Sequence, residues 1–220
     1  MKKLMIAIFA HPDDEAFGPS GTLLKLRDEG TDLHLILLTD GEGGTNSDNL
    51  SDLGMTRLDE WQSSAALLGA TTTHALHYPD GGLEHLTGVE LDQEASDRIT
   101  EIMASYATPP LLSFMTFEPL GLTGHHDHIA ASHLTTRMAH RFAARDIWYF
   151  CLSQTQAPLS DTAYYEPRAR EDTYITDRID ITAYLSAKYR VIDAHVSQHS
   201  DGATMKKLGD VTEHFHIDRL

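Results

Sequence analysis

An apolar run passes directly into an acidic turn near the beginning of the chain, in the stretch Leu4-Met5-Ile6-Ala7-Ile8-Phe9-Ala10-His11-Pro12-Asp13-Asp14-Glu15. The first six residues predict a buried strand, and a helical segment is expected after the turn. One imidazole and three carboxylates would then lie just beyond the carboxyl end of a first strand, where open α/β sheets bind ligands. Neighbouring like charges repel unless a positive group lies among them, and a divalent cation is the simplest such group. A helix-capping aspartate beside a surface histidine is the alternative interpretation.

Strand and helix signals alternate along the rest of the chain, which favours a doubly wound parallel sheet. The predicted strands lie at about 3–9, 33–38, 73–77, 111–117 and 147–150. The predicted helices lie at about 15–29, 56–68, 90–106, from the histidine cluster at 125–128 to about 144, and 182–196. Residues 153–172 are expected to form a long loop, and the tail after Asp201 is left unassigned. The fold class expected for residues 1–220 is therefore a single three-layer α/β/α sandwich with a Rossmann-like, mostly parallel sheet.

The charge balance limits the partners of the protein. The chain has 17 Lys and Arg against 33 Asp and Glu, a formal net charge of −16. Such a field repels nucleic-acid phosphates and anionic lipid, so we expect neither nucleic-acid nor membrane binding, and a small neutral or polar substrate fits better. The sequence allows a homo-oligomer.

The cysteine count and the start of the chain bear on its compartment. The single Cys151 excludes a disulfide within the chain and a cysteine-based zinc site, and it fits a reducing cytoplasm. Six apolar residues after Lys3 are too few for a signal peptide, so a cytoplasmic location is expected.

A second cluster, Gly124-His125-His126-Asp127-His128, follows the fourth predicted strand as the acidic turn follows the first. First and fourth strands are often neighbours in doubly wound sheets, so the two clusters should face each other across one crevice. Two histidines and one carboxylate would hold a mononuclear zinc ion and leave a fourth position for water, whose pKa the ion lowers from ~9 to ~7. A solvated, acid-flanked loop is the alternative for this cluster. The same ligand types also suit a non-haem Fe(II) enzyme.

The two clusters together resemble the paired signature of the PIG-L/LmbE-like zinc-dependent deacetylases, which remove an acetyl group from N-acetylglucosamine units. Weaker similarities to this family lie at Thr39–Glu42, at Arg57 with Glu60, at Leu68–Gly69, at Pro79–Gly81, and at Lys188, His195, Ser197 and Gln198. One departure is visible, because the position before Asp127 is commonly proline in the family and is His126 here. That change keeps the spacing of the ligands and adds a spare imidazole.

The resemblance implies a role for each residue of the two clusters. The implied zinc ligands are His11, Asp14 and His128. Asp13 would be the general base on the zinc-bound water. His125 would stabilise the oxyanion or protonate the leaving amine, and Asp127 would orient His125 and favour its imidazolium form.

Two further residues are candidates for substrate binding. Arg57 would hold a substrate hydroxyl or carboxylate, with a surface ion pair to Asp59 or Glu60 as the alternative. Glu42 is the second candidate. Glu15 is expected to be a helix acid or a partner of the ligands, and His195 either a core histidine or a functional one. Residues 42–55 and 153–175 are expected to select the aglycone.

The function expected from these residues is metal-dependent hydrolysis of the N-acetyl amide of an N-acetylglucosamine-type amino sugar or its conjugate, releasing acetate. The expected cofactor is Zn²⁺, with Fe²⁺ or another divalent metal as the alternative, and the expected partner is a small amino-sugar substrate. The competing interpretations are a metal-binding or sensing protein without turnover and a non-haem Fe(II) enzyme. Intact Asp13 and His125 disfavour a sensor, because metal binding alone requires neither.

Overall fold

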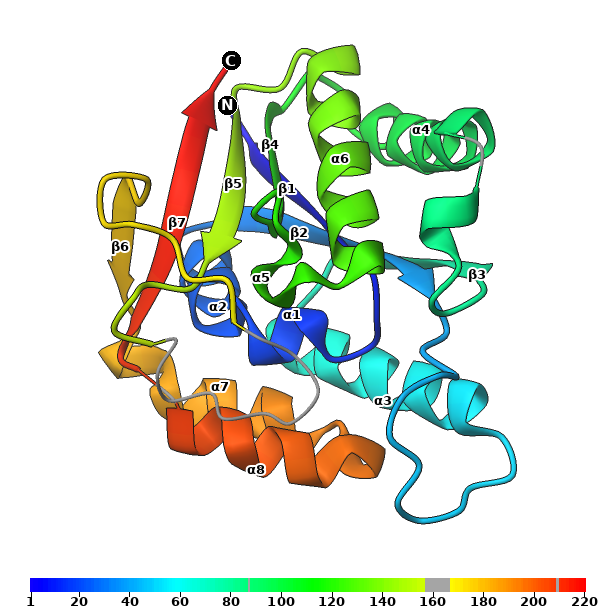
Figure 1. Cartoon of the computed structure of the whole chain (residues 1–220). Coiled ribbons are helices and arrows are strands. Elements are labelled where there is room, and N and C mark those ends of the chain that lie inside the picture. The colour runs from blue at the N-terminus through cyan, green and yellow to red at the C-terminus, as the bar shows by residue number, and fades with distance from the viewer. Residues whose placement is uncertain (87, 157–166, 209) are drawn as a thin grey trace.

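A seven-stranded sheet forms the middle layer of the molecule (Figure 1). The computed structural model describes residues 1–86, 88–156, 167–208 and 210–220. The strands are β1 Lys3–Phe9, β2 Thr31–Thr39, β3 Thr72–Tyr78, β4 Leu111–Phe117, β5 Asp146–Cys151, β6 Asp177–Asp180 and β7 Thr212–Arg219, in the order β3-β2-β1-β4-β5-β7-β6. Strands β1 to β5 pair in parallel, and β7 is antiparallel to β5 and β6. The expected mostly parallel sheet is confirmed.

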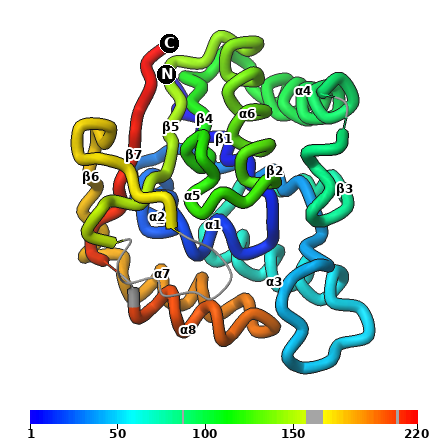
Figure 2. Tube along the Cα trace, in the orientation of Figure 1, coloured from blue at the N-terminus to red at the C-terminus, as the bar shows by residue number. Residues whose placement is uncertain are grey.

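Helices cover both faces of this sheet and complete the three layers. They are α1 Asp14–Phe17, α2 Ser20–Asp28, α3 Leu53–Leu68, α4 Gly88–Ala104, α5 Gly121–Gly124, α6 His126–Arg141, α7 Leu185–Asp193 and α8 His199–Leu208, with 3-10 turns η1 Leu83–His85, η3 Thr182–Tyr184 and η4 Val196–Gln198. Helix α6 packs on β1, β4 and β5, and it contacts α4 on the same face. Helices α2, α3, α7 and α8 form the opposite layer, as the Cα trace also shows (Figure 2).

Strand β1 divides its side chains between two apolar cores, because successive residues of a strand point to opposite faces. Its even-numbered residues pack with α4 and α6, and its odd-numbered residues pack with α2, α3 and α7. The even set is Leu4, Ile6 and Ile8, and the odd set is Met5, Ala7 and Phe9. Burial on both faces explains why this strand reads as a continuous apolar run.

The helix expected over residues 15–29 is wrong as a single element. The structure divides it into α1 and α2, with Gly18 and Pro19 between them. Proline lacks a backbone N–H and disfavours a helical conformation in the residue before it, and Gly18 is accordingly non-helical at φ −85° and ψ −107°. Helix α2 then presents the free N–H groups of Gly21 and Thr22 to Glu213 of β7 at 3.0 and 2.7 Å.

The unassigned tail contains most of α8 and all of β7. Strand β7 lies between β5 and β6, so the last strand of the chain continues the sheet in the opposite direction. Much of the loop expected over 153–172 lies outside the described residues. Within the described ranges, no helix has both the length and the apolar character needed to cross a bilayer.

Candidate active site

The two predicted clusters meet at the carboxyl edge of the sheet, because β1 and β4 are adjacent parallel strands. His11 follows β1 by two residues, whereas His125 and His128 lie at the beginning of α6, beyond β4. The ring centroids of these histidines are 4.7 Å (His11–His125), 5.1 Å (His11–His128) and 4.9 Å (His125–His128) apart. Segments separated by more than a hundred positions thus form one site at the edge where open α/β sheets bind ligands.

The three predicted metal ligands converge on one point. His11 Nδ1 lies 3.1 Å from His128 Nε2. Asp14 Oδ1 lies 3.2 Å from His128 Nε2, and Asp14 Oδ2 lies 3.7 Å from His11 Nδ1. Zinc holds nitrogen and oxygen ligands at about 2.0–2.1 Å in a tetrahedron, which places neighbouring ligand atoms about 3.3 Å apart. The distances from His128 Nε2 to His11 Nδ1 and to Asp14 Oδ1 are close to this value, so these atoms could hold one ion. His125 lies near enough to His11 and His128 to be a further candidate ligand, and Asp80 and Asp127 form a second possible set with His11.

Both histidines have neighbours that favour the ligating tautomer. His128 Nδ1 lies 3.2 Å from the carbonyl oxygen of Gly121, so a proton on Nδ1 leaves the Nε2 lone pair for a metal. His11 Nε2 lies 3.0 Å from Asp80 Oδ1 and 3.4 Å from Asp127 Oδ2, which places its proton on the far side of the ring from His128. Burial lowers the pKa of His11, but these carboxylates outweigh burial and raise the pKa to about 10. A metal ion must therefore displace a proton when it binds.

Asp14 is fixed by the backbone of its own turn. Its Oδ2 accepts hydrogen bonds from the N–H groups of Ala10 at 3.1 Å and His11 at 2.9 Å, and its Oδ1 faces His128. Burial raises the pKa of Asp14, but His128 and His11 outweigh burial and hold the pKa well below its usual range. The two imidazoles therefore favour the ionised form of Asp14.

Asp13 contacts a different partner, the guanidinium of Arg57 on α3. Arg57 Nη2 donates to Asp13 Oδ2 at 2.9 Å and to the carbonyl oxygen of Pro12 at 2.6 Å, while Nη1 donates to Gly41 at 2.6 Å. Arg57 is only 3% exposed, so the alternative of a surface ion pair with its helix neighbours is wrong. Burial raises the pKa of Asp13 to about 6, against the lowering effect of Arg57.

The side chain of Asp127 lies close to His11 and accepts hydrogen bonds from a neighbouring loop, and its charge also acts on His125. Asp127 Oδ2 accepts from the N–H of Gly81 at 2.7 Å, and Oδ1 accepts from the N–H of Leu83 at 3.1 Å. The backbone N–H of Asp127 donates to His125 Nδ1 at 3.2 Å, which makes His125 the N-cap of α6. The described contacts of the carboxylate therefore position His11 and the loop that follows β3.

The charge of His125 depends on opposing neighbours. Burial lowers its pKa, and His11 and His128 lower it further, to about 4. Asp127 and Asp14 act in the opposite direction and favour the imidazolium that the resemblance implies. A bound cation would lower the pKa of His125, because like charges disfavour each other.

Three residues have contacts at the edge of the site. Glu42 is exposed, and its Oε1 accepts from the backbone N–H of Asp80 at 2.9 Å, so it supports the loop that carries Asp80. The spare imidazole of His126 is also exposed and pairs with Glu84 at 2.5 Å. Asp80 lies within Pro79–Gly81, one of the weaker similarities to the family, but its contact with His11 was not predicted; an acid in a motif shared with a metal-dependent family was the usable signal.

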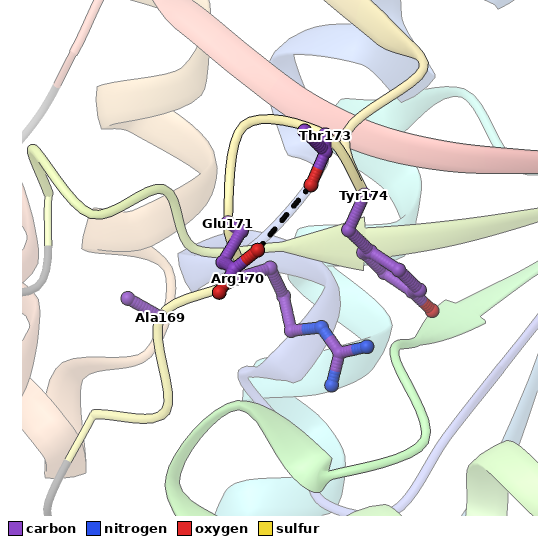
Figure 3. Close-up of a pocket in the computed structure, with 5 residues that line it drawn as sticks. All are labelled: Ala169, Arg170, Glu171, Thr173 and Tyr174. Atoms are coloured by element: carbon purple, nitrogen blue, oxygen red, sulfur yellow. Dashed lines mark hydrogen bonds between the residues drawn. The ribbon is translucent and has the colours of Figure 1, made fainter.

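An open pocket of about 510 Å³ lies beyond β5, lined by Ala169, Arg170, Glu171, Thr173 and Tyr174 (Figure 3). Arg170 covers one face of the Tyr174 ring at 3.8 Å, and His216 stacks on Tyr174 with centroids 4.3 Å apart. Arg170 also pairs with Glu118 at 3.4 Å, at the end of β4. Because both contacts occupy Tyr174, its ring is not available as a platform for a sugar.

The guanidinium of Arg168 lies against Gly124, the residue before His125. Its Nε, Cζ and Nη2 atoms are 2.5–2.7 Å from the point where a Cβ on Gly124 would lie, so only glycine leaves room for this contact. Gly124 has a φ of +82°, which also favours glycine. The Arg168 side chain is exposed, and within the described ranges no carboxylate forms an ion pair with it.

Comparisons with known proteins were made for the whole chain. Residues 6–139 match the family model described as PIG-L, GlcNAc-PI de-N-acetylase. The chain is 35% identical over 134 residues to diacetylchitobiose deacetylase of Thermococcus kodakarensis, a match that covers 60% of this chain and 47% of that protein. It is 26% identical over 227 residues to 1D-myo-inositol 2-acetamido-2-deoxy-alpha-D-glucopyranoside deacetylase of Actinosynnema mirum, covering 88% of this chain and 80% of that protein.

Solved structures share the fold at lower identity. N,N'-diacetylchitobiose deacetylase from Pyrococcus horikoshii matches with a TM-score of 0.70 and 21% identity, over 99% of this chain and 84% of that one. The 4-carboxy-2-hydroxymuconate hydratase GalB from Pseudomonas putida matches with a TM-score of 0.74 and 15% identity, over 99% and 98%. The same fold thus carries more than one reaction, and the chemistry of this chain has to be argued from its site.

Proposed function

The chain belongs to the PIG-L family, and on that premise we propose that it is a metal-dependent hydrolase that removes the acetyl group from an N-acetylglucosamine-type amino sugar or its conjugate. The observation that carries the proposal is the convergence of His11 Nδ1, Asp14 and His128 Nε2 at 3.1–3.7 Å. Asp13 and His125 stand beside that point, and neither is needed to hold an ion. The named activities of the relatives in both sequence matches are deacetylations of acetamido sugars.

His11, Asp14 and His128 would hold the metal, with Zn²⁺ as the ion that their donor set and spacing suit best. The ion would supply a water of lowered pKa and polarise the acetyl oxygen. The carboxylates of Asp80 and Asp127 orient His11 and strengthen it as a ligand. Arg57 holds Asp13 ionised and in place.

Asp13 accepts the proton of the attacking water while the oxygen–carbon bond forms at the acetyl group. Neutral His125 donates a hydrogen bond to the oxyanion that develops on the acetyl oxygen. When the carbon–nitrogen bond breaks, the proton on Asp13 passes to the amine, and acetate and the free amino sugar leave. A low pKa leaves His125 without a second ring proton to give, so the proton held by Asp13 is the one available for that second step.

Arg168 is the candidate contact for the part of the substrate distant from the acetamido group. It rests against Gly124, the residue before His125. A carboxylate or phosphate on the aglycone would be the natural partner of a guanidinium that forms no ion pair with the carboxylates of the described residues. Arg57, the earlier substrate-binding candidate, is instead committed to Asp13.

The test is acetate release from methyl N-acetylglucosaminide by the purified protein, before and after metal removal and after reconstitution with Zn²⁺. We expect turnover that disappears on chelation and returns with the metal. His128→Ala should lose both metal and turnover, and His126→Ala, two residues earlier on the same helix and exposed, is the matched control that should keep both. Metal binding without acetate release would favour a sensor, and oxygen uptake with ferrous iron would favour the non-haem iron alternative.

A further inference from the structure

Glu15, the last acid of the turn, is fully buried and contacts none of the predicted metal ligands. Its Oε1 accepts the hydroxyl proton of Ser64 on α3 at 2.5 Å and lies 3.0 Å from Nε2 of His195. Its Oε2 accepts the backbone N–H of Asp13 at 3.3 Å. Ser64 and His195 are 0% and 1% exposed. A buried chain of hydrogen bonds therefore leads from the far helical layer to the backbone of Asp13.

The backbone of Asp13 needs external support. Its φ is +113°, in the left-handed region that residues with a Cβ avoid, and such conformations persist where the surroundings hold them. Arg57 holds one side, through the carbonyl oxygen of Pro12 and the carboxylate of Asp13. Glu15 holds the other side, through the N–H of Asp13.

The position of His195 is itself determined by contacts with α3. Ser197, two residues later, donates to Glu60 through both its backbone N–H and its hydroxyl, each at 2.7 Å. Gln198 Nε2 donates to the carbonyl oxygen of Thr45 at 2.9 Å. These bonds fix η4 on α3, so the imidazole reaches Glu15 from a rigid support.

We propose that Ser64 and His195 are positioning residues, which act through Glu15 to hold the Asp13 carboxylate at the reacting water. The proposal rests on the function proposed above, in which Asp13 is the proton acceptor. Neither residue touches the substrate. If Ser64 and His195 instead only stabilise the fold, replacing either one should lower kcat by the same factor whether or not residue 13 can accept a proton.

A double-mutant cycle distinguishes these two possibilities, because residues that act through one another are not additive. Ser64→Ala and His195→Ala are each made in the wild-type protein and in the Asp13→Asn variant. In the wild type we expect kcat to fall about 10-fold for Ser64→Ala and up to about 10²-fold for His195→Ala, the usual effect of slight misplacement of a reacting group. KM and metal content should stay unchanged. In the Asp13→Asn variant each substitution should change the residual kcat less than about twofold.

Two further variants test whether loss of a buried hydroxyl alone lowers kcat and whether a conservative replacement of His195 restores it. Ser132→Ala removes an equally buried helical hydroxyl, on α6 and away from Glu15, and should leave kcat unchanged. His195→Gln keeps an amide donor near the position of Nε2 and should recover most of the activity lost in His195→Ala. Ser64→Ala leaves the contact between His195 and Glu15 in place, so it provides the cycle if His195→Ala does not fold.

Hydrogen exchange of the Asp13 amide gives a readout that does not depend on turnover. Ser64→Ala should accelerate this exchange at least about tenfold, since the acceptor of the N–H becomes mobile, while amides of β1 stay protected. Equal fold-changes in kcat in both backgrounds, or unchanged exchange at Asp13, would overturn the inference. A wild-type protein that releases no acetate would refute the proposed function instead, and with it the premise of this inference.

Discussion

Isosteric replacement of the two adjacent aspartates should have opposite consequences. Asp14 uses one oxygen for the backbone N–H groups of Ala10 and His11 and the other for the metal point beside His128. An asparagine has only one oxygen. If it turns its NH₂ toward the backbone, two buried donors lose their acceptor, which costs about 1–3 kcal/mol for each. If it turns the NH₂ toward the metal point, the backbone bonds survive and the amide donates to an imidazole nitrogen.

The second orientation is cheaper by about 2–6 kcal/mol, so Asp14→Asn should fold without metal, and its loss of stability should be limited to the attraction between the carboxylate and the two imidazoles that lower its pKa. Its metal affinity should fall more than about 100-fold, because loss of a residue that merely supports a ligand already costs about 10–100-fold. Asp13→Asn keeps an oxygen for Arg57 and should bind metal normally. Its kcat should fall at least about 10²-fold, the lower end of general-base contributions.

The assay combines zinc titration, elemental analysis, thermal unfolding of the metal-free protein, and acetate release. Excess zinc should partly restore Asp14→Asn and should not restore Asp13→Asn. If Asp13→Asn loses the metal while Asp14→Asn retains it, the two roles are exchanged. If Asp14→Asn unfolds without metal while keeping its metal affinity, the orientation argument is wrong.

Four further outcomes follow from other contacts. His125→Ala should retain the metal and lose about 10²–10³ in kcat, as for other oxyanion donors, whereas an unchanged kcat with raised KM would limit it to binding. Arg168→Gln should raise KM about tenfold for p-carboxyphenyl N-acetylglucosaminide and leave the p-carbamoylphenyl analogue unaffected; equal effects on both would exclude charge recognition. Lys188→Met should lower the free energy of unfolding, measured by urea denaturation, by about 3–5 kcal/mol, because Glu213, 2.6 Å from the ammonium, stays buried without its cation and keeps only the N–H groups of Gly21 and Thr22. The double variant with Glu213→Gln should recover part of the loss. Burial lowers the pKa of His34 to about 4, so the folded state binds fewer protons than the unfolded state between pH 6.5 and 4. As the pH falls from 6.5 to 4, the free energy of unfolding of the wild type should therefore fall by about 3 kcal/mol. The fall should be smaller in His34→Gln.

The sequence determined much of the fold because the signals for β1 to β5 are local. Both sides of β1, β2, β4 and β5 are buried, so each reads as an apolar run that stands out from its surroundings, whereas the edge strand β3 is mostly half-buried or exposed. The sequence gives no such run for β7, because its surroundings change along its length: Glu213, His214 and Phe215 are buried, while Asp218 and Arg219 are exposed. Glu213 is paired by residues distant in sequence, the N–H groups of α2 and the ammonium of Lys188.

The site was predictable to the extent that its residues occur in compact motifs. The clusters at 10–15 and 124–128 contain the converging ligand atoms, and the adjacency of β1 and β4 followed from the expected strand order. The second layer of contacts was not predictable in the same way. Asp80 reaches His11 from the loop after β3, and His195 reaches Glu15 across 180 positions, so only the three-dimensional packing joins them.

In the proposed function, the turn at 12–14 gives two adjacent aspartates different roles. Metal-assisted hydrolysis needs one carboxylate that never takes up a proton, to hold the cation, and another that accepts a proton near neutral pH. The left-handed backbone at Asp13 sends its carboxylate to Arg57, while Asp14 folds back on its own N–H groups. The pKa of Asp14 is held low by two imidazoles, and burial raises that of Asp13 to about 6. The backbone conformation at Asp13, set by a single φ angle, thus separates the proton acceptor from the metal ligand. A substitution of a neighbouring residue that relaxes this φ should bring both carboxylates toward the same cation, and it should reduce turnover before it reduces metal binding.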